Sequence, residues 1–382
     1  MGFHEFSSPY DWSRIAAYKR TAKAAFGGMI DLSVGSPVDP VPDSVRKALA
    51  VAANDPNAYG YPVTAGTADL RAAIAEWFSA TRNVDLQAIR ADVVPTVGSK
   101  EGVALMASLL HFGEDDVVVQ PKVSYPTYEI GTQLAGAQVL KVDDVADVAS
   151  WRNVPGVKAV WVNSPCNPTG EVYSAERMAG IVAAAREIGA VVLSDECYAL
   201  MQWRGATNSA DGDPLQSTPC ALRSDVCAGS AEGVLVLYSL SKQSNMAGYR
   251  TAFIAGDEAL VAPMSAYRKQ IGQIIPGPVQ AAMAAGLRDL ESVKVQHARY
   301  RERLGVLVSA LRAYGYCTDM PDGALYVWVR AKSGDCWTDM EQLAKIGIIA
   351  SPGEFYGAPE CLRFSATASD EAIASAAERL VR

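Results

Sequence analysis

The sequence predicts an α/β protein with a mostly parallel central sheet and a second, smaller α/β domain. The unbroken apolar runs Val117–Val119 and Val234–Tyr238, and the mostly apolar segment Val157–Val162, are typical of strands buried on both faces. Segments with the spacing of helices separate these runs, as crossover connections between parallel strands require. A chain of 382 residues is also too long for one simple core.

Composition limits the classes of function. Hydrophobic residues make up 49% of the chain, and 34 Lys+Arg against 42 Asp+Glu give a net charge of -8. No basic run favours nucleic acid or an anionic membrane, and no apolar run approaches the length of a bilayer. The first residues lack the pattern of a signal peptide. We therefore expect a soluble, cytoplasmic protein whose partners include neither nucleic acid nor membrane.

Cysteine and histidine usage argues against metal chemistry. The seven cysteines are scattered, odd in number and without a Cys-x-x-Cys pair, as expected of free thiols in a reducing compartment. The three histidines, His4, His111 and His297, form no cluster with metal-ligand spacing. We expect no metal site, and a zinc hydrolase or a histidine-based triad is disfavoured.

The N-terminal part predicts an arm and a helix in residues 1–30, followed by a short strand and a Gly-Pro turn over Ile30–Pro37. Helices are expected over Pro42–Ala53 and from about Ala68 to Ala80. The loop between these two helices is rich in tyrosine and glycine.

A third helix is expected to begin at Gly98, Ser99 and Lys100, directly after an apolar strand. Unpaired backbone N–H groups at a helix start attract anions. An ordinary serine-capped helix explains the same residues. The pattern alone leaves both interpretations open.

Three polar side chains each follow a separate predicted strand. Asn167 comes after the strand 157–162, Asp195 after the strand 190–193, and Lys242 after the strand 234–238. Because the carboxyl ends of parallel strands meet at one edge of an open α/β sheet, we expect these groups to converge there.

Lys242 has two interpretations. A lysine at the end of a buried strand is commonly a surface residue with a buried stem. Alternatively, its desolvated amine forms a Schiff base with an aldehyde cofactor. Ser239 lies three residues before it and Arg250 eight residues after it. A hydroxyl and a guanidinium beside an amine suit an aldehyde that carries a phosphate.

The remaining chain predicts a long loop over 204–231, which is rich in Gly, Ser, Asp and Pro. Helices are expected to dominate from Pro276, including one over Arg288–Leu311. Strands are expected over Tyr326–Arg330 and Cys361–Ser365, and the second of these contains Arg363.

Several motifs together resemble the class I and II aminotransferases, which are pyridoxal-phosphate (PLP) enzymes of fold type I. They are Ser-Leu-Ser-Lys with Gly-Tyr-Arg (239–250), Asn-Ser-Pro-Cys-Asn-Pro-Thr-Gly (163–170) and Asp-Glu-Cys-Tyr (195–198). The resemblance extends from about Ile30 to Ser365. It implies residues 1–40 as an arm with part of the small domain, 41–275 as a large PLP-binding domain and 276–382 as the C-terminal small domain.

The resemblance also implies a role for each matching residue. Lys242 is the catalytic residue that anchors PLP and moves the substrate proton. The other implied cofactor-binding residues are Tyr61, Ser99, Lys100, Tyr125, Asn167, Asp195, Tyr198, Ser239 and Arg250. The implied substrate-binding residues are Gly35, Asn167 and Arg363.

These implied roles follow recognisable chemistry. Asp195 pairs with the pyridine nitrogen, so that the ring stays cationic and accepts electrons. Asn167 and Tyr198 hydrogen-bond the phenolic oxygen, and Tyr125 stacks on the ring. Arg363 holds the substrate carboxylate through two parallel hydrogen bonds.

Tyr61 lies in the segment Tyr-x-x-x-Ala-Gly-x-x-x-Leu-Arg (61–71). In the family, the tyrosine of this segment reaches the cofactor phosphate of the other subunit. The resemblance therefore implies a homodimer with shared sites, acting on small amino acids and keto acids.

Local stretches resemble actinobacterial N-succinyldiaminopimelate aminotransferases of lysine biosynthesis. Among them are Ser-Val-Gly-Ser-Pro-Val-Asp-Pro (33–40) and Gly-Glu-Phe-Tyr-Gly (353–357). The resemblance implies N-succinyl-2-amino-6-ketopimelate as the keto substrate and glutamate as the amino donor. Arg20, Arg268 and Lys269 are unranked candidates to bind the succinyl group.

Three alternatives stay open at this point. The chain resembles aminotransferases for aspartate, aromatic or branched substrates in the same motifs. A PLP-dependent carbon–sulfur β-lyase would also use this site. A PLP-binding regulator would need a DNA-binding domain, for which the roughly 30 residues before the first strand leave no room.

Overall fold

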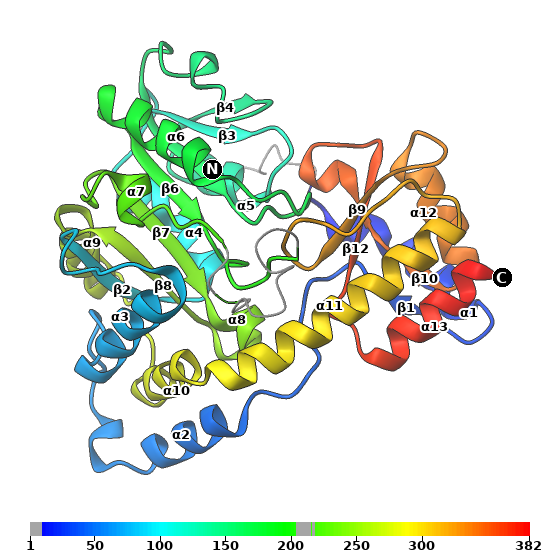
Figure 1. The fold of residues 1–382 in the computed structure, drawn as a ribbon, viewed down its shortest axis with the longest axis horizontal. Coiled ribbons are helices and arrows are strands. Elements are labelled where there is room, and N and C mark those ends of the chain that lie inside the picture. Colours follow the sequence, from blue (N-terminus) through cyan, green and yellow to red (C-terminus); the bar gives the residue numbers. More distant parts are fainter. Residues whose placement is uncertain (1–9, 204–214, 216–217) are drawn as a thin grey trace, which may run out of the picture.

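The computed structural model describes residues 10–203, 215 and 218–382. Its centre is a seven-stranded sheet in the order β2-β8-β7-β6-β5-β3-β4 (Figure 1). The strands are β2 (Ala91–Val97), β3 (Val117–Pro121), β4 (Gln138–Val142), β5 (Val157–Asn163), β6 (Val191–Asp195), β7 (Val234–Ser239) and β8 (Thr251–Asp257). Within this sheet β8 alone runs opposite to the other six strands, so the predicted mostly parallel sheet is confirmed.

Helices cover both faces of this sheet because alternate strand residues point to opposite sides. One face packs on α3 (Ala68–Arg82), α6 (Ala175–Glu187) and α10 (Gly277–Arg288). The other face packs on α4 (Ser99–Leu109), α5 (Thr127–Leu134) and α9 (Glu258–Gln270). Within β7, Val236 contacts the first group and Leu237 the second.

The smaller domain is built on a three-stranded antiparallel sheet of β11 (Ser351–Pro352), β12 (Cys361–Ser365) and β9 (Tyr326–Arg330). A short parallel pair joins β1 (Ile30–Asp31) to β10 (Ile348–Ile349). The surrounding helices are α1 (Ala16–Ala24), α11 (Leu290–Ala313), α12 (Cys336–Lys345) and α13 (Asp370–Val381). Their apolar side chains form a second core, separate from that of the large sheet.

The contacts of α10 and α11 bear on the domain boundary that we placed at residue 276. Helix α10 packs against α2 (Asp43–Ala53) and α3, and its Met283 lies in the core of the large sheet. Helix α11 continues from there into the small domain (Figure 1). Val293 contacts the large core, whereas Leu304 lies in the small one. We therefore propose a boundary within α11.

The loop predicted over 204–231 differs from the structure in its last part. Residues 204–214 and 216–217 lie outside the described residues. Ser224–Cys227 forms the short helix α7, because Val226 and Cys227 are apolar and fill the core beside α6. Among the described helices, none has the length and apolar character needed to cross a bilayer.

Candidate active site

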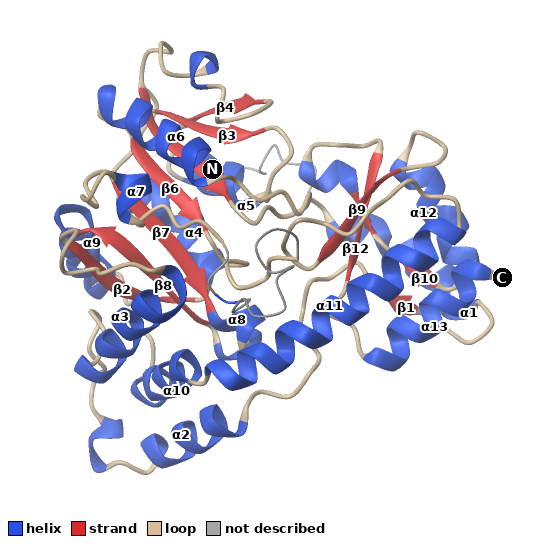
Figure 2. Ribbon diagram, in the orientation of Figure 1, coloured by secondary structure: helices blue, strands red, loops and turns tan. Residues whose placement is uncertain are grey.

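A cavity of about 360 Å³ lies beyond the carboxyl ends of β5, β6 and β7, where the two domains meet. In Figure 2 the arrowheads of β6 and β7 point toward this region and toward the short helix α8 (Leu240–Gln243). Residues of β9 and β12 line the cavity from the small domain. The three polar groups expected after separate strands therefore meet at one place.

Eleven of the predicted site residues line this cavity: Gly35, Ser99, Lys100, Tyr125, Asn167, Asp195, Tyr198, Ser239, Lys242, Arg250 and Arg363. Tyr61 does not line it, because its side chain is fully exposed on the surface of this chain. Eight further lining residues escaped the sequence analysis: Tyr10, Trp12, Val34, Cys197, Ser241, Ala247, Tyr326 and Tyr356.

Asp195 ends β6 with its carboxylate buried. It accepts hydrogen bonds from the Tyr128 hydroxyl at 2.8 Å and from the Cys197 backbone N–H at 3.1 Å. Burial raises the pKa of Asp195. In the part of the chain that the structure describes, no Lys or Arg forms an ion pair with this carboxylate. A buried acid of this kind complements a cationic group brought by a ligand.

Asn163 positions the next polar group. Its side-chain oxygen accepts a hydrogen bond from the Asn167 N–H at 2.8 Å, and its amide donates to the Asp195 backbone carbonyl at 2.9 Å. One side chain therefore ties the turn after β5 to the end of β6. The motif Asn-x-Pro-x-Asn contained Asn163, but its positioning function depends on the neighbouring strand, which sequence spacing alone does not identify.

A cradle for an anion forms at the start of α4. Gly98 precedes the helix with φ at 79°, and no described side chain caps the first N–H groups. The serine-capped alternative is therefore not what the fold contains. A Cβ on Gly98 would lie 2.6 Å from Cζ of Arg250, so the missing side chain makes room for this guanidinium. Free N–H groups and a guanidinium suit a phosphate.

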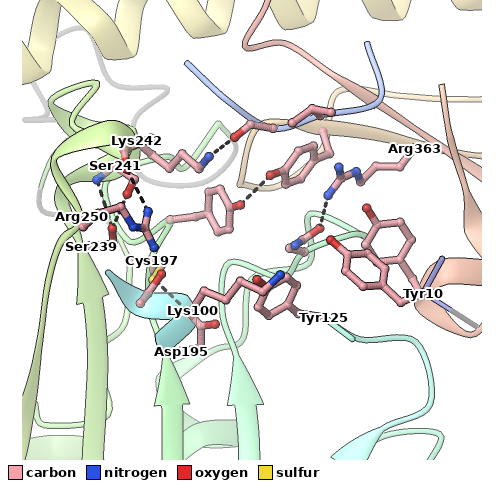
Figure 3. Close-up of a pocket in the computed structure, with 18 of the residues that line it drawn as sticks. Tyr10, Lys100, Tyr125, Asp195, Cys197, Ser239, Ser241, Lys242, Arg250 and Arg363 are labelled. Atoms are coloured by element: carbon pink, nitrogen blue, oxygen red, sulfur yellow. Dashed lines mark hydrogen bonds between the residues drawn. The ribbon is translucent and has the colours of Figure 1, made fainter. Parts of the chain in front are cut away.

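Lys242 lies on α8, one residue beyond Ser241. Its Nζ donates a hydrogen bond to the backbone carbonyl of Gly35, which comes from the small-domain side of the cavity (Figure 3). Burial lowers the pKa of Lys242, and the positive charge of Arg363 lowers it further. Because a neutral amine is the nucleophilic form, this environment favours attack on an aldehyde.

Arg363 is 4% exposed and points into the cavity from β12 (Figure 3). Its guanidinium donates to Oδ1 of Asn167 at 2.7 Å and to the Ser33 carbonyl at 2.8 Å. Its Nε has no hydrogen-bond partner, and no carboxylate among the described residues pairs with it. A buried, unpaired guanidinium is costly unless a ligand brings an anion.

The candidates for binding a succinyl group lie elsewhere. Arg268 is buried and forms an ion pair with Glu101 at 2.8 Å, so its charge is already compensated. Arg20 and Lys269 are exposed, and none of the three lines the cavity. The sequence identifies these three residues as charged but does not show where their side chains point.

The arrangement fits PLP on the chemistry of its groups. Asp195 suits a cationic ring nitrogen, and the α4 cradle with Arg250 suits a phosphate. Lys242 suits the aldehyde, and Tyr125 offers an aromatic face. Arg363 has no partner in this arrangement and is available to bind the carboxylate of a second molecule, the substrate.

Comparisons with known proteins agree with this chemistry. The family model for aminotransferase class I and II matches residues 27–380. The chain is 40% identical to the 4-dedimethylamino-4-oxo-anhydrotetracycline transaminase OxyQ of Streptomyces rimosus, over 97% of this chain and 98% of that protein. It is also 40% identical to the probable aminotransferase Rv1178 of Mycobacterium tuberculosis, over 97% of this chain and 84% of that protein.

A solved structure of a probable N-succinyldiaminopimelate aminotransferase from Thermus thermophilus superimposes with a TM-score of 0.84 at 28% identity. The match covers 97% of this chain and 99% of that one. Members of this family use PLP. The predicted fold and cofactor are therefore confirmed, and the chain belongs to the class I and II aminotransferases.

Proposed function

We propose that this aminotransferase acts on N-succinyl-2-amino-6-ketopimelate, with glutamate as amino donor and 2-oxoglutarate as the second product. The observation that carries the aminotransferase part is the buried Arg363 guanidinium, which lacks an anionic partner among the described residues. Both proposed substrates carry a carboxylate next to the reacting carbon. A planar guanidinium binds such a carboxylate through two parallel hydrogen bonds.

The chemistry assigns a task to each side chain that lines the cavity. PLP, when bound, supplies an electron-accepting ring for the carbon that loses its proton. Lys242 anchors the cofactor and carries the proton on Nζ, for which its lowered pKa suits it. Asp195 keeps the ring nitrogen protonated. Tyr198 and Asn167 donate to the phenolic oxygen.

The position of Lys100 favours a substrate that carries an acidic group far from its reacting carbon. Its amine lies 5.4 Å from the ring centroid of Tyr10 at the cavity. Burial, and then the charge of Arg250, lower the pKa of this amine. No carboxylate among the described residues forms an ion pair with it. A succinyl carboxylate would meet an available positive charge there.

A bulky ring ketone is the second candidate substrate, because the cavity wall is aromatic. Tyr10, Trp12 and Tyr356 line the cavity together with Tyr125. Such a wall suits a flat, extended substrate, and OxyQ is named for an oxo-anhydrotetracycline.

A substrate panel tests the proposal. Purified holoenzyme is given 2-oxoglutarate with N-succinyl-diaminopimelate, its N-acetyl analogue or aspartate, and glutamate formation is measured. We expect the succinyl compound to have the highest kcat/KM. Preference for aspartate, or for a polycyclic ketone with glutamate as donor, would contradict the substrate assignment. A separate reaction with cystathionine and no keto acid tests the β-lyase, which would release a thiol, pyruvate and ammonia.

Lys100→Gln provides the matched test of the distal group. Loss of a charge-assisted hydrogen bond is expected to raise KM for the succinyl compound roughly tenfold. The N-acetyl analogue lacks that carboxylate, so its KM should change little. An equal rise in KM for both compounds would mean that Lys100 does not bind the succinyl carboxylate.

We also propose that two chains form a dimer in which Tyr61 reaches the partner's cofactor phosphate. Support comes from Tyr59, Tyr61 and Val63, which are all exposed in the segment between α2 and α3. Light scattering gives the mass of the assembly. In a mixture of inactive Lys242→Ala and weakened Tyr61→Ala chains, hybrid dimers should contain one intact site. No recovery of activity on mixing would contradict the shared site.

Gly98→Ala is expected to weaken PLP binding at least roughly tenfold. The new Cβ would displace Arg250 from the cradle, and the positive φ adds strain. Titration of apoenzyme with PLP, followed by absorbance, measures the change. Gly136→Ala is the control, because Gly136 has a φ of 78° and open space around it. If both variants lost the same PLP affinity, backbone strain and not displacement of Arg250 would explain the loss.

A further inference from the structure

Two buried phenols join the domains inside the cavity. The Tyr198 and Tyr326 hydroxyl oxygens lie 2.6 Å apart, and their rings meet edge to face at 73°. Tyr198 follows β6 of the large sheet, whereas Tyr326 begins β9 of the small one. One hydrogen bond therefore connects a side chain three residues beyond Asp195 with the sheet that carries Arg363.

Two residues, Arg363 and Gly35, limit the position of Tyr326. The guanidinium of Arg363 lies over its ring, with Cζ 3.9 Å from the ring centroid. A Cβ on Gly35 would overlap the hydroxyl oxygen of Tyr326 and would lie 3.0 Å from its Cε1 and Cζ. The missing side chain of Gly35 therefore leaves room for this phenol, a reason that the sequence did not indicate.

The charges around the pair are unequal. Burial raises the pKa of Tyr198 well above its ordinary value. Burial alone would also raise the pKa of Tyr326, but Arg363 and Lys242 hold it below the ordinary value. Cys197 is a titratable neighbour of both phenols, and Tyr300 and Tyr356 also lie near Tyr326. Either hydroxyl can donate in this pair, and the lower pKa of Tyr326 makes its hydroxyl the better donor.

We propose that Tyr326 is a positioning residue that donates to Tyr198 and leaves the Tyr198 proton free for the phenolic oxygen of PLP. Because hydrogen bonds in a chain strengthen one another, Tyr198 becomes a stronger donor. Arg363 acts on Tyr326 through the ring contact. Binding of a carboxylate to Arg363 weakens its field at Tyr326 and so changes the proton donor at the cofactor. The inference rests on the proposed functions of Tyr198 and Arg363.

The test follows the proton on Nζ of Lys242 in holoenzyme without substrate. A donor at the phenolic oxygen draws away negative charge that would otherwise hold this proton. Losing the donor therefore raises the pH at which lysine-bound PLP loses its yellow colour. We expect Tyr326→Phe to raise this midpoint by about half to one pH unit.

Two further variants separate this effect from a general disturbance. In the Tyr198→Phe background, adding Tyr326→Phe should change the midpoint no further, because the relay is already broken. Tyr356→Phe is the matched control: Arg363 also contacts that ring, at 4.8 Å, but its hydroxyl lies 3.2 Å from Oγ of Ser351. Its midpoint should equal that of wild type.

A second readout uses propionate, an inert monocarboxylate. Saturating propionate should raise the wild-type midpoint and raise that of Tyr326→Phe by less. An unchanged midpoint in Tyr326→Phe, additive effects with Tyr198→Phe, or an equal shift in Tyr356→Phe would overturn the proposal. The substrate panel tests the proposed function separately, because these titrations contain no amino acid or keto acid.

Discussion

Lys242→Ala is expected to lower kcat roughly 10⁴-fold or more, which is the largest effect of any single change in this chain. The substitution removes both the anchor of PLP and the group that carries the substrate proton, and general acid–base catalysis alone contributes about 10²–10⁴-fold. The yellow absorbance of lysine-bound PLP should also disappear. Stopped assays of glutamate formation and a visible spectrum measure the two losses.

Lys269→Ala serves as the control for this experiment. Lys269 is exposed on α9 and does not line the cavity, so its loss should leave spectrum and rate unchanged. Added methylamine should restore part of the rate to Lys242→Ala by replacing the missing amine. A yellow Lys242→Ala protein with near-normal turnover would show that another residue anchors the cofactor.

Arg363→Lys is expected to lower kcat/KM for amino acids by roughly 10²- to 10³-fold. Lysine keeps the charge but loses the planar pair of donors, and breaking a buried charged pair costs about 2–5 kcal/mol. The substitution also removes the hydrogen bond to Asn167 and the ring contact with Tyr326. Steady-state kinetics with glutamate and 2-oxoglutarate measure the loss.

An amine without a carboxylate provides the internal control. Its slow reaction with the enzyme does not need Arg363 as a carboxylate partner, so the rate should fall far less than that of glutamate. Equal loss for both donors would mean that Arg363 acts on the cofactor or on the fold instead. A spectrum of the variant checks that PLP is still bound.

Much of the fold could be predicted because local patterns and burial agree. The apolar run Val234–Tyr238 became β7, and the strand expected over Tyr326–Arg330 became β9 with the same bounds. The convergence of Asn167, Asp195 and Lys242 could be predicted because the carboxyl ends of parallel strands lie at one edge of the sheet. The placement of these residues in one cavity is observed, whereas their catalytic tasks remain predictions.

The rest depended on contacts between distant segments. Tyr128 supports Asp195 across 67 positions of sequence, and nothing around Tyr128 distinguishes it from packing. Tyr326 begins an ordinary small-domain strand, and its meeting with Tyr198 follows from how the domains pack. The boundary at residue 276 took no account of α10, whose apolar side belongs to the large core.

The side chains around the cavity have a consequence for the speed of substrate capture. Among the described residues, Lys100, Lys242, Arg250 and Arg363 line it with a single carboxylate, Asp195, although the whole chain carries a net charge of -8. An anion that approaches this acidic protein is therefore attracted to the cationic opening of the cavity. Dissolved salt shortens the range of that attraction to about 8 Å at physiological ionic strength. Association rates for dicarboxylates should fall as sodium chloride is added, whereas those for a neutral amine should stay level. A flat response for both would mean that diffusion to this opening proceeds without electrostatic steering.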